Sequence, residues 1–222
     1  MKSLIHNILN RVLRYFSLRI VKAPSHPQAL KKIQERVIVQ PECKCVYVGC
    51  GDDSIEGFVG SDLRDTDAAD IICPAWKLSE YANNLECIYS RHMLEHLTFE
   101  QAIVTLSDWF RTLRPSGEVV ICVPNLEFHA HKLGILSNEE IKNWNGILTK
   151  NCKVSEALSG FFGWQRESSP ILSLEDIANW DIHKSGYTVQ ILTKILDIVG
   201  FVDIQTTIEQ EKHLIATARK PI

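Results

Sequence analysis

Two glycines that follow a short apolar run are the first residues whose types and spacing suggest chemistry. Residues 45–48 lead directly into Gly49, Cys50 and Gly51, a pattern that predicts a buried strand ending in a tight turn. The backbone of such a turn can approach a ligand closely because glycine has no side chain. Asp62 ends the next predicted strand, where a carboxylate can accept hydrogen bonds from both hydroxyls of a ribose. Together these features predict a nucleoside site.

The short spacing between the glycines and this acid separates two classes of cofactor. Asp62 follows Gly51 by only eleven residues. In dinucleotide enzymes the acid lies about 20 residues further on, and a helix N-terminus between them holds the pyrophosphate. The intervening Asp52 and Asp53 would also repel a phosphate, whereas they would suit a cationic sulfonium group. The spacing therefore favours S-adenosylmethionine over NAD.

The run from His92 to His96 matches the HxxEH pattern of a class of zinc peptidases. On a helix, His92 and His96 would share one face and could bind zinc. The run instead follows a predicted strand within an alternating series of strands and helices, and short patterns match readily by chance. We therefore expect no metal site, and we interpret Glu95 and His96 as a local network that anchors the loop after this strand.

A third group of polar and aromatic residues, 179–188, precedes the last predicted helix. Thr188 is expected to cap that helix. His183 could serve as a general base for a hydroxyl acceptor, and a surface or capping role is an equal alternative. His129 and His131 are weaker candidates of the same kind.

Four short segments, residues 46–51, 57–63, 88–97 and 113–118, follow one another along the chain. As a set in this order they resemble the class I S-adenosylmethionine-dependent methyltransferases. More narrowly, they resemble a compact bacterial branch often associated with cell-surface polysaccharide synthesis. The resemblance implies an α/β fold, a Rossmann-like three-layer sandwich with a mostly parallel seven-stranded sheet whose last strand is antiparallel.

The resemblance also implies S-adenosylmethionine as cofactor and assigns residues to it. Gly49, Cys50 and Gly51 would lie under the methionine and ribose, Asp62 would bind the ribose hydroxyls, and Leu63 would contact the adenine.

His92 would line the side from which the methyl group is transferred. Ala75 and Trp76 follow the third strand, where the family often has an acid that reads the adenine amino group. Because no acid stands there in this chain, a backbone amide or the Trp76 ring would have to replace it. The wider family often ends the first strand with an acid, and here Tyr47 takes that place.

The elements that must position these residues alternate between strand and helix. Strands are expected at about 45–48, 58–61, 70–73, 86–90 and 118–123, the last after a turn at 115–117, with a final pair at 201–208 and 214–219. A helix is expected over 98–113, with Thr98 as N-cap and Gln101 three residues on. Another is expected over 188–199, closed by Gly200. Such alternation predicts a mostly parallel sheet.

Two segments do not follow this alternation of strands and helices. Residues from about 126 to 185 break the alternation and are expected to form a substrate-side insertion in a methyltransferase domain that covers 25–222. Residues 1–24 are expected to form a basic amphipathic helix, because residues 1–22 hold five bases, no acid and an apolar stripe at helical spacing. This helix would lie on an anionic membrane surface or pack on the protein's own body or a partner.

Composition narrows the class of protein further. The chain has 222 residues, of which 45% are hydrophobic, enough for one sizeable domain. A net charge of -3 gives no indication of a nucleic-acid partner. Seven cysteines without paired CxxC motifs favour buried thiols in a reducing cytoplasm over disulfides or zinc. We expect a cytoplasmic protein, with peripheral contact at the inner membrane face through residues 1–22 as an option.

The function favoured by these features is methyl transfer from S-adenosylmethionine to a small-molecule or saccharide acceptor. Such transfer needs mainly alignment and a site that excludes water, so catalytic residues leave little trace in a sequence. A non-catalytic cofactor-binding or scaffold protein on the same fold is the alternative. A zinc hydrolase that uses the HxxEH run is a third and weaker hypothesis. The oligomeric state stays open.

Overall fold

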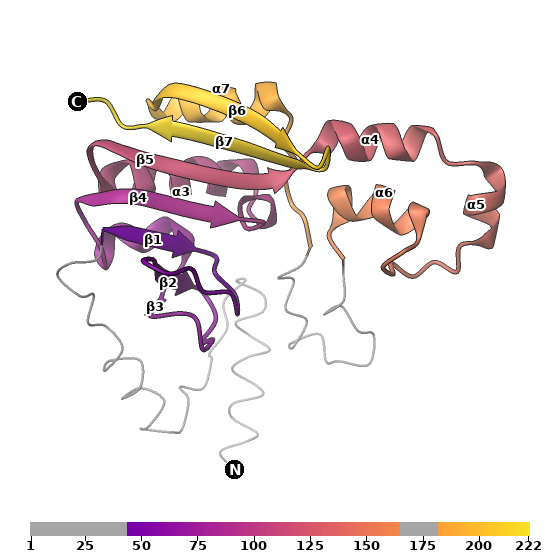
Figure 1. Ribbon diagram of the computed structural model, residues 1–222, viewed down its shortest axis with the longest axis horizontal. Helices are drawn as coiled ribbons and strands as arrows, with labels where there is room; N and C mark the ends of the chain where they lie inside the picture. Colours follow the sequence, from indigo (N-terminus) through magenta and orange to yellow (C-terminus); the bar gives the residue numbers. More distant parts are fainter. Residues whose placement is uncertain (1–43, 165–181) are drawn as a thin grey trace, which may run out of the picture. The chain divides into compact units, whose positions relative to one another are not determined.

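A computed structural model describes residues 44–164 and 182–222. Its centre is a seven-stranded sheet in the order β3-β2-β1-β4-β5-β7-β6 (Figure 1). The strands are β1 (Cys45–Val48), β2 (Val59–Asp62), β3 (Ile71–Ile72), β4 (Leu85–Arg91), β5 (Leu113–Pro124), β6 (Val202–Glu209) and β7 (His213–Arg219). The first five pair in parallel, whereas β7 runs antiparallel to both β5 and β6. The predicted mostly parallel sheet with an antiparallel last strand is confirmed.

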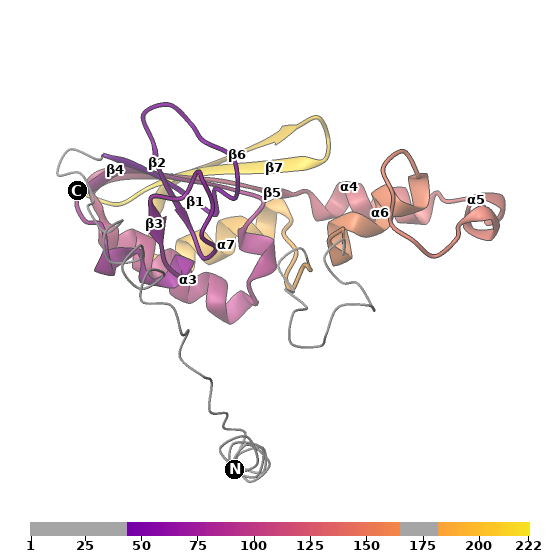
Figure 2. The same ribbon diagram turned by 90° about the horizontal axis from the view of Figure 1, so that it is seen from below.

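Helices cover one face of this sheet within the described residues. The helices α3 (Phe99–Thr112) and α7 (Val189–Val199) lie side by side on that face (Figure 2), and the 3-10 helix η1 (Ala75–Glu80) packs against α3. Trp109 and Leu196 are fully buried in the core beneath them. Because side chains alternate along a strand, Tyr47 points to the opposite face, where it joins a smaller cluster with Cys50 and Ala69.

All three predicted helix ends form as expected. The Thr98 hydroxyl accepts from the Gln101 amide at 3.2 Å, and the Gln101 side chain accepts from the Thr98 amide at 3.0 Å, so the capping box is complete. Thr188 caps α7 by accepting from Ile191 at 3.3 Å. Gly200 ends α7 at a φ of 102°, in the left-handed region where glycine carries no steric cost.

The turn predicted at residues 115–117 is wrong as a separate element, because β5 begins at Leu113 immediately after α3. The extra residues are absorbed as an irregularity inside the strand, where the register against β4 shifts between the Leu85–Leu113 and Cys87–Glu118 pairs. Such a bulge bends a strand without ending it.

Three helices follow β5 and lie beyond its carboxyl end (Figure 1): α4 (Leu126–Gly134), α5 (Asn138–Asn143) and α6 (Lys153–Phe162). Helix α4 packs on α6. They fall in the segment predicted as a substrate-side insertion. The predicted N-terminal helix, residues 1–24, and residues 179–181 lie outside the described residues. No helix of the described part is both long and apolar enough to cross a membrane.

Candidate active site

The glycine turn after β1 is tied directly to the end of β2. Gly49 and Gly51 have φ values of 73° and 57°, which favour glycine. The Gly49 amide donates to the Ser61 carbonyl at 2.7 Å, and the Gly51 amide donates to Asp62 Oδ2 at 2.8 Å. The turn and the acid therefore form one fixed unit.

Asp62 is almost fully buried and already has partners on both oxygens. Its Oδ1 atom accepts from the Arg64 amide at 2.8 Å and from Arg64 Nε at 3.3 Å, while Oδ2 accepts from Gly51. A carboxylate offers about four acceptor positions, so three are used within the protein. One position remains for a ribose hydroxyl, where the sequence suggested two hydrogen bonds.

A pocket of about 320 Å³ opens beside this unit. Six of the eight predicted cofactor residues line it: Gly49, Asp62, Leu63, Ala75, Trp76 and His92. All of these lie at or just after the carboxyl ends of β1, β2, β3 and β4, which is where ligands bind in open α/β sheets. The lining also includes Arg64 and Lys184, two cations that the sequence analysis did not single out.

The remaining residues of the glycine turn face elsewhere. Cys50 is 2% exposed and lies with Tyr47 and Ala69 in the smaller core cluster. Burial raises the pKa of the Cys50 thiol to about 12, so it stays protonated. Asp52 and Asp53 are exposed and are not among the residues that line the pocket. The charge argument that linked these two acids to a sulfonium therefore finds no support in the structure.

Helix α3 fixes the segment that carries Ala75 and Trp76. The indole of the fully buried Trp109 donates to the Ala75 carbonyl at 2.9 Å. One residue earlier along α3, Asp108 accepts from the Ser79 amide at 3.0 Å. The wall of the pocket formed by Trp76 thus rests on a helix whose N-terminus is capped and whose core face is buried.

A second and larger pocket, of about 790 Å³, lies between the carboxyl ends of β4 and β5 and the helices α4 and α6. Five of the eight histidines of the chain line it: His92, His96, His129, His183 and His213. Two of them, His92 and His96, line the smaller pocket as well. The two pockets therefore meet at these two side chains.

Glu95 stands at the centre of the histidines and is 1% exposed. Its Oε1 atom accepts from His92 Nδ1 at 3.1 Å and lies 3.9 Å from His183 Nε2. Burial alone would raise the pKa of Glu95, but the hydrogen bond from His92 and the nearby His96 and His183 hold that pKa below its ordinary value. The carboxylate is therefore ionised at neutral pH.

The helix that a peptidase motif needs is not formed at these residues. His92 has a φ of 50°, and Leu94–His96 is a single 3-10 turn, η2. His92 and His96 accordingly take different partners. His92 Nε2 lies 3.1 Å from His213 Nδ1, whereas His96 Nδ1 donates to the Ile182 carbonyl at 3.1 Å.

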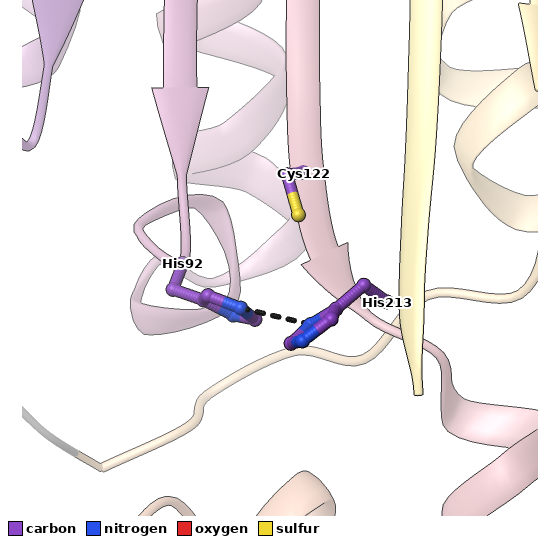
Figure 3. Close-up of side chains that lie close together, drawn as sticks. All are labelled: His92, Cys122 and His213. Atoms are coloured by element: carbon purple, nitrogen blue, oxygen red, sulfur yellow. Dashed lines mark hydrogen bonds between the residues drawn. The ribbon is translucent and has the colours of Figure 1, made fainter. Parts of the chain in front are cut away.

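The rings of His92 and His213 face one another below Cys122 (Figure 3). Because ionised Glu95 can only accept, His92 Nδ1 carries a proton; the Nε2 atom of neutral His92 then accepts from His213 Nδ1–H. This leaves a lone pair on His213 Nε2. Burial, His92 and the cations Arg91 and Lys212 lower the pKa of His213 to about 4, so the ring is neutral near pH 7.

His213 was missed by the sequence analysis because no local motif surrounds it. It lies 121 residues from His92 and reaches it only because Pro124 of β5 pairs with His213 of β7. The predicted base candidate His183 lines the larger pocket, with Nδ1 donating to the Gly160 carbonyl at 2.9 Å.

The two weaker histidine candidates lie in different environments. His129 is buried and donates to the Glu156 carbonyl at 2.9 Å, while His131 is exposed on α4 and does not line the pocket.

No family model and no curated protein sequence matches the chain. Among solved structures it is similar to an S-adenosylmethionine-dependent methyltransferase from Archaeoglobus fulgidus, at 15% identity over 87% of this chain and 93% of that chain, with a TM-score of 0.47. It is also similar to a 1,6-didemethyltoxoflavin-N1-methyltransferase from Burkholderia thailandensis, at 14% identity over 91% and 94% of the two chains, with a TM-score of 0.46. A phosphoethanolamine N-methyltransferase from Haemonchus contortus matches at 13% identity, 90% and 54% coverage, and a TM-score of 0.45.

The order and direction of the strands in the sheet identify the fold. Five parallel strands are followed by an antiparallel β7 inserted between β5 and β6, and the smaller pocket opens at the carboxyl ends of the parallel strands. The chain has the fold of the class I methyltransferases. The smaller pocket lies at this edge of the sheet, and the larger pocket adjoins it at His92 and His96.

Proposed function

We propose that this protein transfers a methyl group from S-adenosylmethionine, bound in the smaller pocket, to an acceptor bound in the larger pocket. The observation that carries the proposal is that two pockets of different lining meet at His92 and His96. A bisubstrate reaction needs such a junction, because donor and acceptor atoms must be held in line and within van der Waals contact.

The residues of the smaller pocket fit the parts of this cofactor. Asp62 offers one acceptor position to the ribose, and Leu63 and Trp76 offer apolar surface to the adenine. Arg64 and Lys184 supply positive charge for the methionine carboxylate. The support is therefore chemical and comes from side chains on three different loops.

When bound, the cofactor supplies an electrophilic methyl carbon, to which an acceptor lone pair bonds while the carbon–sulfur bond breaks and leaves its electron pair on sulfur. The protein aligns the acceptor and takes up its proton. For a hydroxyl acceptor, we assign its proton to His213 Nε2. The chain of hydrogen bonds leaves the lone pair of this atom free.

The proton on His213 Nδ1 then passes to His92 Nε2, so that the positive charge forms beside ionised Glu95. Such a relay compensates for the low basicity of His213, because the cation is stabilised one residue further on.

The larger pocket favours a hydroxyl-rich acceptor, either a small molecule or a saccharide. Its lining combines five histidines with Lys150, Lys153 and Lys212 and the aromatic Trp164. Hydrogen-bonding groups around one aromatic side chain suit a sugar-like ligand better than an apolar one. A role in cell-surface polysaccharide synthesis, in the cytoplasm or at the inner membrane face, rests on the resemblance of the sequence motifs.

Calorimetry with S-adenosylmethionine and S-adenosylhomocysteine tests the proposal. We expect one site per chain for each ligand. Absence of binding for both, at protein concentrations above the expected dissociation constant, would rule out the proposal. Binding of both without formation of S-adenosylhomocysteine across a panel of saccharide and small hydroxylated acceptors would instead support the non-catalytic alternative.

A further inference from the structure

The Oε2 atom of Glu95 is buried and has no hydrogen-bond partner within residues 44–164 and 182–222. A buried acceptor without a partner costs roughly 1–3 kcal/mol, and more when it is charged. The other oxygen, Oε1, is held by His92 at 3.1 Å. Oε1 also lies 3.9 Å from His183 Nε2, so the carboxylate has accepting capacity left for a ligand beside the histidines.

Two histidines present free ring nitrogens beside this carboxylate. His96 Nδ1 lies 3.1 Å from the Ile182 carbonyl, and His183 Nδ1 lies 2.9 Å from the Gly160 carbonyl. A carbonyl oxygen can only accept, so both Nδ1 atoms carry the proton, and both Nε2 atoms keep a lone pair when the ring is neutral.

We propose that Glu95, His96 and His183 bind a divalent transition-metal ion, Zn²⁺ by preference, through the carboxylate and the two Nε2 atoms. Ligand atoms of the three side chains lie within 4.8 Å of one another. Around a bound ion they would be separated by roughly 3–3.5 Å, from metal–ligand distances of about 2.0–2.2 Å. Small side-chain rotations close that difference.

The supporting contacts are those expected around a metal site. Metal-binding histidines commonly donate their second N–H to a carbonyl, and ligating carboxylates are themselves hydrogen-bonded. All three side chains meet this condition. The segment that carries His183 is also fixed on the turn that carries Glu95, because the amides of Lys184 and Ser185 donate to the Glu95 carbonyl at 2.8 Å and 3.1 Å. The donor set is thus held before any ion binds.

The sequence predicted no metal site at these residues. The proposed site also uses a different pair of histidines from the one in the HxxEH pattern. That pattern pairs His92 with His96, whereas the structure pairs His96 with His183. Two histidines and one carboxylate, with the remaining side open to the larger pocket, form the kind of set that holds zinc in catalytic sites with an exchangeable position.

A second group, His92, Cys122 and His213, is also close enough to hold an ion but is less suitable. The two rings hydrogen-bond to each other at 3.1 Å (Figure 3), so their facing nitrogens already have partners. Burial raises the pKa of the Cys122 thiol to about 11, and the thiolate is the form that binds metal. This group therefore serves as the control in the experiment.

The role of the ion in methyl transfer rests on the proposed function. A bound divalent ion would hold the acceptor oxygen and lower its pKa, in the pocket where His213 is placed to take the proton. Binding of the ion by itself does not depend on that role.

Zinc content measured by mass spectrometry tests the site. The sample is full-length protein without a polyhistidine tag, equilibrated with zinc and then dialysed. We expect one zinc per chain. In His96→Asn and His183→Asn the side-chain amide keeps a donor for the carbonyl but removes the ligating nitrogen, so zinc affinity should fall more than about 100-fold, beyond the effect of losing a supporting contact. Exposed His131→Asn and Cys122→Ser should keep full zinc content.

Three results would overturn the site: no zinc in the wild-type protein, full zinc in folded His96→Asn and His183→Asn, or zinc lost in Cys122→Ser alone. Circular dichroism checks folding, and Glu95→Gln provides a further variant if either histidine variant is unfolded. Calorimetry with S-adenosylhomocysteine on the same samples separates the two proposals. His183 lines only the larger pocket, so His183→Asn should lose zinc and keep cofactor affinity. Zinc binding without cofactor binding would reject the proposed function and leave the metal site standing.

Discussion

The carboxylate of Asp62 holds three hydrogen bonds within the protein before any ligand arrives. One comes from Gly51 in the turn after β1, and two come from Arg64 in the loop after β2. A single side chain therefore shapes the smaller pocket and also contributes one acceptor position to it.

Replacing Asp62 by Ala should weaken S-adenosylhomocysteine binding by roughly 1–3 kcal/mol, since the Gly51 and Arg64 amides lose their acceptor and the ribose loses its own. Asp62→Asn keeps the shape and one acceptor oxygen, so its loss should be smaller. Calorimetry of both variants, with circular dichroism to check the fold, measures the effect. Unchanged affinity in Asp62→Ala would show that another residue holds the ribose.

The relay from His213 through His92 to Glu95 predicts an unusual titration. Because burial and neighbouring cations lower the pKa of His213 to about 4, its ring signals in NMR spectra should titrate near pH 4 and stay unchanged between pH 6 and 8. His92→Ala removes one of the groups that lower this pKa and should raise that midpoint. A midpoint near 6.5, the ordinary value for histidine, would contradict the arrangement in Figure 3.

At the scale of elements, α6 forms the wall of the larger pocket because it packs closely on α4. A Cβ atom at Gly160 would lie 2.1 Å from the ring of His129, so only glycine allows the two helices to approach this closely. The same helix supplies the carbonyls of Glu156 and Gly160 to His129 and His183. Packing of α6 on α4 and placement of the pocket histidines therefore depend on each other.

Gly160→Ala should lower the free energy of unfolding by about 1–3 kcal/mol, the usual cost of overpacking. Gly134→Ala at the end of α4 is the matched control, because a Cβ there meets nothing within 4 Å. That control should leave stability unchanged or raise it by up to about 1 kcal/mol. Urea denaturation measures both variants, and equal stabilities would show that α4 and α6 are less closely packed than the structure indicates.

At the scale of the whole molecule, the buried His129 and the half-buried His213 link folding to pH. Burial lowers the pKa of His129, and burial with nearby cations lowers that of His213 to about 4. As pH falls below about 6.5, the unfolded chain binds protons at these histidines before the folded chain does. The contribution of these histidines to the free energy of unfolding is therefore complete above pH 6.5. It decreases as the pH falls towards their pKa values in the folded protein.

Urea denaturation should accordingly give a lower free energy of unfolding at pH 5.5 than at pH 7.5. His129→Asn removes one of the titrating groups, so the difference between the two pH values should shrink. A wild-type protein that is equally stable at both would contradict the burial of these rings in the neutral form.

Local chemistry determined the elements of this protein and half of its site. Thr98 with Gln101, Thr188 and Gly200 specify their helix ends within a few residues, so those boundaries were predictable. Gly49 and Asp62 were predictable for the same reason. Gly49 lies in a turn, and Asp62 ends the strand that follows it. The bulge in β5 was not predictable from the sequence, because pairing with β4 decides whether a Pro-Ser-Gly run ends a strand or bends it.

Only the tertiary structure decided what the histidines do. The sequence paired His92 with His96 by spacing, but the backbone at His92 turns away from a helix, and the two side chains find partners far along the chain. His213 reaches His92 through the pairing of β5 with β7, and His183 reaches Glu95 through backbone hydrogen bonds to the η2 turn. Such contacts depend on the register and packing of distant segments, which local periodicity does not record. The sequence alone therefore indicated the cofactor, and only the folded chain brought the histidines together in one cluster.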